Sequence, residues 1–251
     1  RALADERAAV RRARVVIANS RRTGRDAVER LGAAPERVHA VYYGTDPERF
    51  RPPSPEERAA ARAALGVEGD TSVAVFVGAL GDRRKGFDTL FRAWTEVRSA
   101  KCEVRSAPVL LVVGTGSELP AWRARAAAEG LGGIRFLGFR GDVREVLRAA
   151  DLLVSPTRYE AYGLAVQEAL CCGLPALVSA DAGVAERYPA SLHPLLLADP
   201  DDAAELRDRL RDVLADPGRY RSAVLALSDE LRAWSWDRMA ARIVDILEGA
   251  A

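Results

Sequence analysis

Hydrophobic residues follow two patterns along the chain. Short, nearly continuous apolar runs occupy residues 72–77, 109–113, 134–137, 152–154, 175–178 and 195–197. Most of them are separated by segments in which apolar residues recur every three or four positions, at 87–97, 119–129, 143–149 and 164–170. Continuously apolar strands that alternate with amphipathic helices are typical of a parallel sheet covered on both faces. The pattern therefore predicts a doubly wound, Rossmann-like α/β domain over residues 47–235.

The residues before this domain supply too few elements for a core of their own. The elements expected there are helices over 3–13 and 21–31 and strands over 15–18 and 38–43. Ser20 is placed to cap the second helix, and Gly32 to end it. Without a larger sheet, the two strands are expected to be mobile, to pair with another chain, or to lie against the helix predicted at 237–247. Three prolines within residues 52–55 mark a linker.

The composition narrows the class of protein. Of 251 residues, 49% are hydrophobic and 29% are charged, as in ordinary globular proteins. The apolar runs are far shorter than the ~20 residues of a membrane span. A net charge of +1 from 37 basic and 36 acidic residues gives no overall field that would attract nucleic acid. The cysteines, Cys102, Cys171 and Cys172, have neither disulfide nor zinc-ligand spacing, so we expect a reducing, cytoplasmic setting.

Candidate chemistry lies in the turns after the strands, because ligands bind outside the carboxyl ends of parallel strands. Residues 78–86 combine glycines with three consecutive cations, which suit a phosphate, although a solvated basic turn fits equally well. This turn is not a P-loop, because the Gly-Lys-Ser/Thr ending is missing. The next turn holds Gly114 and Gly116, but Leu119 takes the place of the third glycine of a dinucleotide fingerprint. An ordinary strand-to-helix turn is an equal interpretation there.

Two later turns carry further polar and aromatic candidates. In the first of them, Phe139 can pack on a base and Asp142 can cap the following helix. In the second, Gly163 permits a helix to begin, and the free N–H groups of a helix N-terminus attract phosphate. Glu160 precedes this helix, and Glu168 lies more than one turn inside it, where an acidic residue can reach ribose hydroxyls. A surface helix with incidental glutamates is the competing interpretation.

Together these segments resemble the family-4 retaining glycosyltransferases of the GT-B fold, also called glycosyl transferases group 1. Glu160 and Glu168 have the spacing of the E-x7-E motif of that family. Further signatures of the family follow in the expected order at residues 16–20, 41–46, 76–78, 85–86, 113–116, 136–139, 168–175 and 234–236. Each signature is weak alone, whereas the ordered set is specific and covers essentially the whole chain.

The resemblance implies an enzyme with two Rossmann-like domains and an active site in the cleft between them. Residues 47–235 would form the domain that binds the nucleotide-sugar donor. Residues 1–46 would be a remnant of the N-terminal acceptor domain, and residues 236–251 a helix that packs back on that domain. The chain as given is then expected to be a fragment without activity of its own.

The resemblance also implies roles for individual residues. Glu168 would bind the ribose hydroxyls and Glu160 would face the donor sugar, while Lys85 and either Arg83 or Arg84 would bind the diphosphate. Glu160 and Lys85 are accordingly the expected catalytic residues. The other donor-binding residues implied are Gly78, the base-site residues Gly116, Phe139 and Arg140, and the phosphate- and sugar-lining residues Tyr162, Gly163 and Leu164. Ala79 departs from the family, since many members have arginine at that position.

The implied ligand is a UDP- or GDP-sugar used as a substrate, with no cofactor and no bound metal. The acceptor would be a saccharide, a lipid or a small molecule, and the whole enzyme could associate peripherally with a membrane. Three alternatives remain: a non-catalytic nucleotide-binding or interaction domain, a GT-B epimerase or phosphorylase, and an NAD-dependent oxidoreductase. The last is disfavoured by Leu119 and by the lack of an acidic residue about twenty residues further on.

Overall fold

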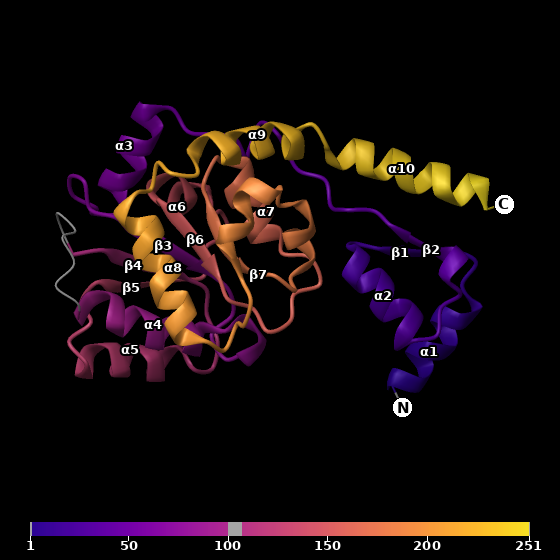
Figure 1. The fold of residues 1–251 in the computed structure, drawn as a ribbon, viewed down its shortest axis with the longest axis horizontal. Coiled ribbons are helices and arrows are strands. Elements are labelled where there is room, and N and C mark those ends of the chain that lie inside the picture. The colour runs from indigo at the N-terminus through magenta and orange to yellow at the C-terminus, as the bar shows by residue number, and fades with distance from the viewer. Residues whose placement is uncertain (1, 100–106, 251) are drawn as a thin grey trace.

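The structure is a computed structural model that describes residues 2–99 and 107–250, so Cys102 lies outside the described residues. Six parallel strands form the main sheet, in the order β5-β4-β3-β6-β7-β8 (Figure 1). They are β3 (Val73–Val77), β4 (Val109–Val113), β5 (Ile134–Gly138), β6 (Leu152–Ser155), β7 (Ala176–Ser179) and β8 (Leu196–Leu197). Each corresponds to one predicted apolar run, and the doubly wound parallel sheet is confirmed. The strand order reverses between β3 and β6, and ligands of such folds bind at this reversal.

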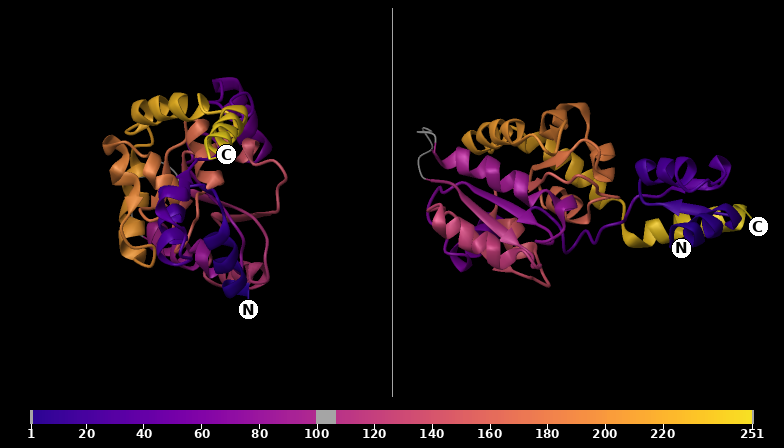
Figure 2. Two further views of the ribbon diagram at one scale, coloured as in Figure 1. Left: turned by 90° about the vertical axis from the view of Figure 1, so that its right-hand side faces the viewer. Right: turned by 90° about the horizontal axis from the view of Figure 1, so that it is seen from below.

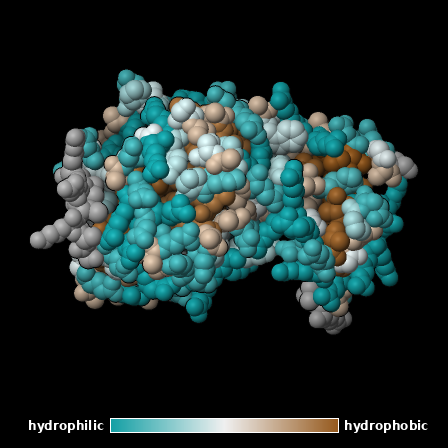
Figure 3. All heavy atoms as spheres, viewed as in Figure 1, coloured by the Kyte–Doolittle hydropathy of each residue, from teal (hydrophilic) through white to brown (hydrophobic). Residues whose placement is uncertain are grey.

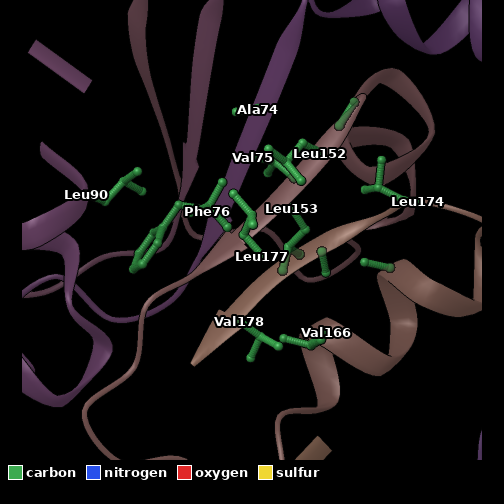
Figure 4. Packing of buried hydrophobic residues seen from close by; sticks show 14 of the residues in the cluster. Ala74, Val75, Phe76, Leu90, Leu152, Leu153, Val166, Leu174, Leu177 and Val178 are labelled. Atoms are coloured by element: carbon green, nitrogen blue, oxygen red, sulfur yellow. The ribbon is translucent and has the colours of Figure 1, made fainter. Parts of the chain in front are cut away.

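Helices lie on both sides of this sheet (Figures 1 and 2). They are α3 (Pro55–Ala64), α4 (Phe87–Ser99), α5 (Leu119–Ala128), α6 (Arg144–Ala149), α7 (Leu164–Cys171), α8 (Ala203–Ala215) and α9 (Arg221–Arg232). Helix α4 packs on α8, α3 on α6 and α7 on α9. Val75 and Phe76 of β3 are almost completely buried beside Leu152 and Leu153 of β6 (Figure 4). Strand β3 is buried on all sides because strands flank both its edges and helices cover both faces.

Helix α3 was missed in the sequence analysis. The proline-rich linker ends directly in this helix, where Ser54 and Glu57 form a reciprocal capping box and Pro55 takes the first helical position. Its inward face carries Arg58 and Arg62 beside Ala61, its buried residue, while the neighbouring alanines 59, 60, 63 and 64 are exposed. A face of this kind gives little hydrophobic periodicity, which explains why the pattern alone did not predict it.

A second, two-stranded parallel sheet forms from β1 (Val16–Ala18) and β2 (Val38–Ala40). It lies with the helices α1 (Ala2–Arg12) and α2 (Arg21–Glu29) and beside the last helix, α10 (Trp236–Gly249) (Figure 2). Ser20 caps α2 by accepting the backbone N–H of Thr23, as predicted. Strand β2 is shorter than expected, because the chain leaves the sheet after Ala40.

The small sheet is held against the end of α9 and the start of α10. Thr45 N–H donates to the carbonyl of Trp234 at 3.0 Å, and the Trp234 indole donates to the carbonyl of Tyr42 at 3.0 Å. A Cβ atom at Gly44 would overlap the backbone of Ser235 and Trp236, so only glycine permits this approach. Of the three outcomes expected for these strands, contact with the tail helix is the one that the structure has.

Helix α10 covers the small sheet only with part of its apolar surface. Ile246 is buried, whereas Trp236, Val244 and Leu247 are exposed. Apolar side chains accordingly gather at the surface around α10 and the small sheet (Figure 3). No helix within residues 2–99 and 107–250 has the length and apolar character needed to cross a membrane. The cytoplasmic setting stays a prediction.

Two buried polar contacts join the small sheet to the main domain. The side-chain amide of Gln167, inside α7, donates to the carbonyls of Tyr43 at 3.2 Å and Gly44 at 2.9 Å. Its carbonyl oxygen accepts the hydroxyl of Tyr162. Ser20 donates its hydroxyl to the carbonyl of Ala161 at 2.8 Å. The start of α2 is thereby fixed to the loop that precedes α7.

Glu186 makes a third connection, from the 3-10 helix Gly183–Arg187. Its carboxylate accepts the backbone N–H groups of Arg21 and Arg22 at 2.9 and 2.8 Å and the hydroxyl of Tyr42 at 2.9 Å. Burial and this bond to Glu186 raise the pKa of Tyr42. A carboxylate at a helix N-terminus is stabilised both by the free N–H groups and by the helix dipole.

We expect Glu186→Ala to loosen the N-terminal part selectively. Loss of three hydrogen bonds at a partly exposed site should lower stability by about 1 kcal/mol and speed amide exchange of Arg21, Arg22 and the rest of α2. Glu230→Ala is the matched control, because Glu230 forms an exposed ion pair with Arg187 that should contribute little. Equal exchange of α2 in both variants would contradict the expectation.

Candidate functional site

A pocket of about 360 Å³ opens at the carboxyl ends of β3 and β6, where the strand order reverses. Five of the predicted site residues line it, namely Lys85, Glu160, Tyr162, Gly163 and Leu164. Other lining residues are Asn19, Tyr43, Phe76, Val77, Ser155, Thr157, Ala161, Ala165 and Val166. The loops after two central strands thus meet at one place, together with two residues of the N-terminal part.

Lys85 and Glu160 form an ion pair in this pocket. The distance from Nζ of Lys85 to Oε2 of Glu160 is 2.6 Å, and both side chains are largely shielded from solvent. Lys85 ends the short 3-10 helix Arg83–Lys85, which Asp82 caps. Gly86 follows with φ of +68°, and a Cβ atom there would overlap the carbonyl oxygen of Pro156. Only glycine therefore lets the loop that carries Lys85 approach the loop that carries Glu160.

Arg158 fastens these two loops together. Its backbone N–H donates to the carbonyl of Arg84 at 2.8 Å, and its guanidinium pairs with Asp88 at 2.8 Å and with Asp201. The sequence analysis did not select Arg158, since nothing in its local sequence indicates these distant carboxylates. Its contacts give it a structural role beside the pocket.

The N-terminus of α7 lies at the edge of the pocket without a side-chain cap. Gly163 takes the N-cap position with φ of +113°, a conformation that favours glycine, and it has no side chain to satisfy the first N–H groups. Leu164 and Ala165, the first residues of the helix, line the pocket. This arrangement suits a bound anion, because free N–H groups and the helix dipole both favour negative charge.

Thr157 adds an unsatisfied polar atom to the same pocket. The residue is 3% exposed, and its hydroxyl has no hydrogen-bond partner among residues 2–99 and 107–250. Buried hydroxyls in folded proteins are normally paired, so the missing partner of Thr157 is expected to be water or a ligand. Its place in the sequence, between Pro156 and Arg158, gave no signal of this.

Glu168 lies on α7 but does not line the pocket. Within the described residues its carboxylate has no hydrogen bond or ion pair, and burial raises its pKa to about 7, against a smaller opposite effect of Arg49. The two glutamates of the motif thus have different surroundings in the structure. Glu160 has a cationic partner, whereas Glu168 is a poorly solvated carboxylate that would gain from hydrogen-bond donors.

The two arginines beside Lys85 do not line the pocket. Arg84 pairs with Asp82 at 2.7 Å, which lowers the pKa of Asp82 to about 2. Arg83 lines a separate hollow of about 200 Å³ next to Phe87 and Trp122. A phosphate contact by either arginine stays a prediction.

The residues predicted to contact the base of the nucleotide are Gly116, Phe139 and Arg140. A Cβ atom at Gly114 would overlap the carbonyl oxygen of Gly78, and one at Gly116 that of Leu80, so close packing of the two turns requires these glycines. Phe139 is 77% exposed, which leaves its ring available for stacking. The guanidinium of Arg140 lies 3.8 Å from Glu145.

Asp142 accepts the backbone N–H of Arg144, the first residue of α6, at 3.0 Å. The N-cap position itself falls on Val143, so the predicted cap is displaced by one residue.

The neighbouring thiols of Cys171 and Cys172 are buried, and burial raises their pKa to about 11 and about 12. Both side chains fill space in the core. In the described part of the chain no three His, Cys, Asp or Glu side chains are grouped to hold a metal ion.

The sequence of residues 71–216 matches the family described as Glycosyl transferases group 1. The chain belongs to this family. It is 30% identical over 260 residues to a D-inositol 3-phosphate glycosyltransferase 1 of Catenulispora acidiphila, with 99% of this chain and 60% of that protein covered. It is 31% identical over 228 residues to a GDP-mannose-dependent monoacylated alpha-(1-6)-phosphatidylinositol monomannoside mannosyltransferase of Corynebacterium glutamicum, with 87% and 58% covered.

This glycosyltransferase chain also resembles the crystal structure of Anabaena Alr3699/HepE in complex with UDP-glucose. The TM-score is 0.84 at 22% identity, with 99% of this chain and 68% of that chain covered. The expected fold is confirmed: the doubly wound sheet of a GT-B glycosyltransferase with a smaller N-terminal α/β part. The chain spans about 60% of the length of the curated relatives named above.

The raised pKa of Glu168 predicts a pH-dependent stability. Its ionised form is less favourable in the folded glycosyltransferase chain than in the unfolded chain, so wild type should lose stability as the pH rises from about 4.5 through about 7. The amide of Glu168→Gln does not titrate. The melting temperature of Glu168→Gln minus that of wild type should therefore increase by a few degrees between about pH 5 and pH 8.

Glu36→Gln, a change at an exposed position, is the matched control. A difference for Glu168→Gln that stays constant over this pH range would refute the assignment of the raised pKa to Glu168.

Proposed function

We propose that the whole protein is a retaining glycosyltransferase that moves a sugar from a UDP- or GDP-sugar to an acceptor, and that this chain supplies the donor-binding part. The observation that carries the proposal is the convergence of Lys85, Glu160 and the uncapped N-terminus of α7 at the strand-order reversal. Family membership supports the reaction class. The names of the relatives support both nucleotides, since one is GDP-mannose-dependent and one neighbouring structure holds UDP-glucose.

The diphosphate of the donor would lie at the start of α7. The N–H groups of Leu164 and Ala165 and the ammonium of Lys85 provide the positive potential there. When the bond between sugar and phosphate breaks, negative charge grows on the leaving diphosphate. Fixed dipoles and a cation in a sheltered pocket stabilise that charge without a metal ion. The Thr157 hydroxyl, which lacks a partner among the described residues, is available to the same oxygens.

Glu160 would face the transferred sugar. Lys85 holds its carboxylate at 2.6 Å, so its position is set before a ligand arrives. Glu168 would accept the two ribose hydroxyls, which supply the donors that its carboxylate lacks. For the base we propose the exposed ring of Phe139 with Arg140 and Gly116, and for further phosphate contacts Arg83 or Arg84. These roles follow the family motif position by position.

The division into domains is also part of the proposal. Residues 47–235 would be the donor domain, residues 1–46 part of an acceptor domain, and residues 236–251 a helix packed on that acceptor domain. The separate sheet of β1 and β2 and the contacts of Gly44 with the start of α10 support it. The apolar residues that α10 exposes are suited to be covered by such a domain.

The first test is calorimetry of UDP, GDP and uridine with the chain in the presence of EDTA. We expect a diphosphate to bind without a divalent metal. Lys85→Ala should lower the affinity for the diphosphate more than tenfold, because loss of a charged partner costs about 1.5–3 kcal/mol. The affinity for uridine should stay almost unchanged. Arg30→Ala, at a distant exposed position, serves as the control. Binding that appears only with Mg²⁺ or Mn²⁺, or equal losses for UDP and uridine, would oppose the proposal.

The second test separates the two glutamates. Glu168→Gln should lower the affinity for UDP or GDP about five- to tenfold, since it changes contacts made in the bound ground state. Glu160→Gln should not lower the affinity for the free diphosphates, because it removes the charged partner of Lys85 and leaves the lysine to bind phosphate. In the whole enzyme, Glu160→Gln should instead lower kcat with nearly normal donor binding. The opposite pattern, with Glu160 controlling nucleotide affinity and Glu168 without effect, would assign the roles to the wrong carboxylates.

A further inference from the structure

The pocket is lined by two residues of the small N-terminal sheet as well as by the main domain. Asn19 follows β1 directly, and Tyr43 follows β2 after two intervening residues. The carboxyl ends of these parallel strands therefore face the same space as the carboxyl ends of β3 and β6. Neither residue was among the candidates selected from the sequence. Their side chains are the polar groups that the N-terminal part offers to a ligand there.

The hydrogen bonds of Asn19 determine what Tyr43 can do. The amide oxygen of Asn19 lies 2.9 Å from the hydroxyl of Thr23, which also lies 3.0 Å from the carbonyl of Ser20, and its amide nitrogen faces Tyr43. This nitrogen donates to the phenol oxygen of Tyr43 at 3.0 Å. The phenol thus serves as an acceptor toward Asn19, and its own proton has no acceptor among residues 2–99 and 107–250. Tyr43 is left with one hydrogen bond to donate.

The ring that carries this hydroxyl is held firmly in place. It makes an edge contact with the buried ring of Tyr162, with centroids 5.2 Å apart, and lies 5.9 Å from the ring of Trp236. The amide of Gln167 also holds the backbone carbonyl of Tyr43. Little conformational freedom remains to be lost when a ligand accepts the bond, which favours selectivity.

We propose that the hydroxyl of Tyr43 donates a hydrogen bond to a hydroxyl oxygen of the sugar carried by the nucleotide, and that Asn19 positions it for this. The inference rests on the proposed function and adds a sugar contact from the N-terminal part. Glu160 lines the same pocket, so a sugar held there meets a carboxylate acceptor and a phenol donor. A site built to hydrogen-bond a particular hydroxyl strongly rejects a ligand that lacks it.

The test compares each nucleotide sugar with its free diphosphate. UDP-glucose, UDP, GDP-mannose and GDP are titrated against wild type and Tyr43→Phe, a change that keeps the ring contacts and removes only the hydroxyl. We expect the nucleotide sugar that binds wild type best to bind the variant about five- to tenfold more weakly. The affinity for its diphosphate should not change. Tyr42→Phe is the matched control, because the hydroxyl of Tyr42 binds Glu186 outside the pocket.

Two changes at Asn19 give an independent test of the direction of the hydrogen bond. In Asn19→Asp, a carboxylate would accept the hydrogen bond of the Tyr43 hydroxyl. The affinity for the nucleotide sugar should then fall as in Tyr43→Phe, and the affinity for the diphosphate should not change. In Asn19→Ala the proton stays available, and the loss should be smaller. A merely structural role of Asn19 predicts the reverse order, since alanine removes more contacts than aspartate.

The outcomes separate this inference from the proposed function. If wild type binds the nucleotide sugars and Tyr43→Phe binds them equally well, the sugar contact is refuted and the proposed function stands. Equal losses for a nucleotide sugar and its diphosphate also refute it, because the hydroxyl would then act on the nucleotide or on the fold. If wild type binds none of the four ligands, both the proposed function and the inference fail.

Discussion

The contact between Gly86 and the carbonyl of Pro156 determines where the charges of the pocket lie. Any side chain at position 86 would overlap this carbonyl, and the backbone there is left-handed. With glycine the turn after β3 can close on the loop after β6, and Lys85 comes within 2.6 Å of Glu160. Arg158 then fixes the closed arrangement through Asp88 and the carbonyl of Arg84. The order of the strands makes the site possible, and this approach of two loops gives it a preset ion pair.

Preorganisation of this kind has an electrostatic reason. A lysine and a glutamate that were free in solvent would have to lose water and conformational freedom when a ligand binds. Here both are partly shielded and already oriented, so an arriving diphosphate needs to reorganise little. The uncapped helix and the Thr157 hydroxyl follow the same principle, because their unsatisfied donors exist before the ligand does.

Much of the fold could be predicted from the sequence, because the parallel strands are continuously apolar and the turns carry their glycines. All six strands of the main sheet and the capping of α2 by Ser20 follow from such local signals. Helix α3 does not, since its inward positions include Arg58 and Arg62 and most of its alanines are exposed, so no apolar stripe appears. In the site, the family signatures singled out Glu160, Gly163 and Lys85, and the structure places all three at one pocket.

Other features of the site depend on distant partners and could not be predicted locally. Arg84 turns to Asp82 rather than to the pocket, and Arg158 finds carboxylates on other elements. Asn19 and Tyr43 reach the pocket because the small sheet docks with its strand ends toward it. Long-range docking of this kind leaves no periodicity in the sequence.

The side chain of Gln167 has a consequence for how the chain unfolds. It is 2% exposed, and its amide serves two carbonyls of the N-terminal part from within a core helix. Detaching that part would break both hydrogen bonds of the Gln167 amide and expose the apolar rings around Tyr162 to water. The small sheet is therefore coupled to the main domain in the folding equilibrium, and heat should melt both in one cooperative calorimetric transition rather than in two.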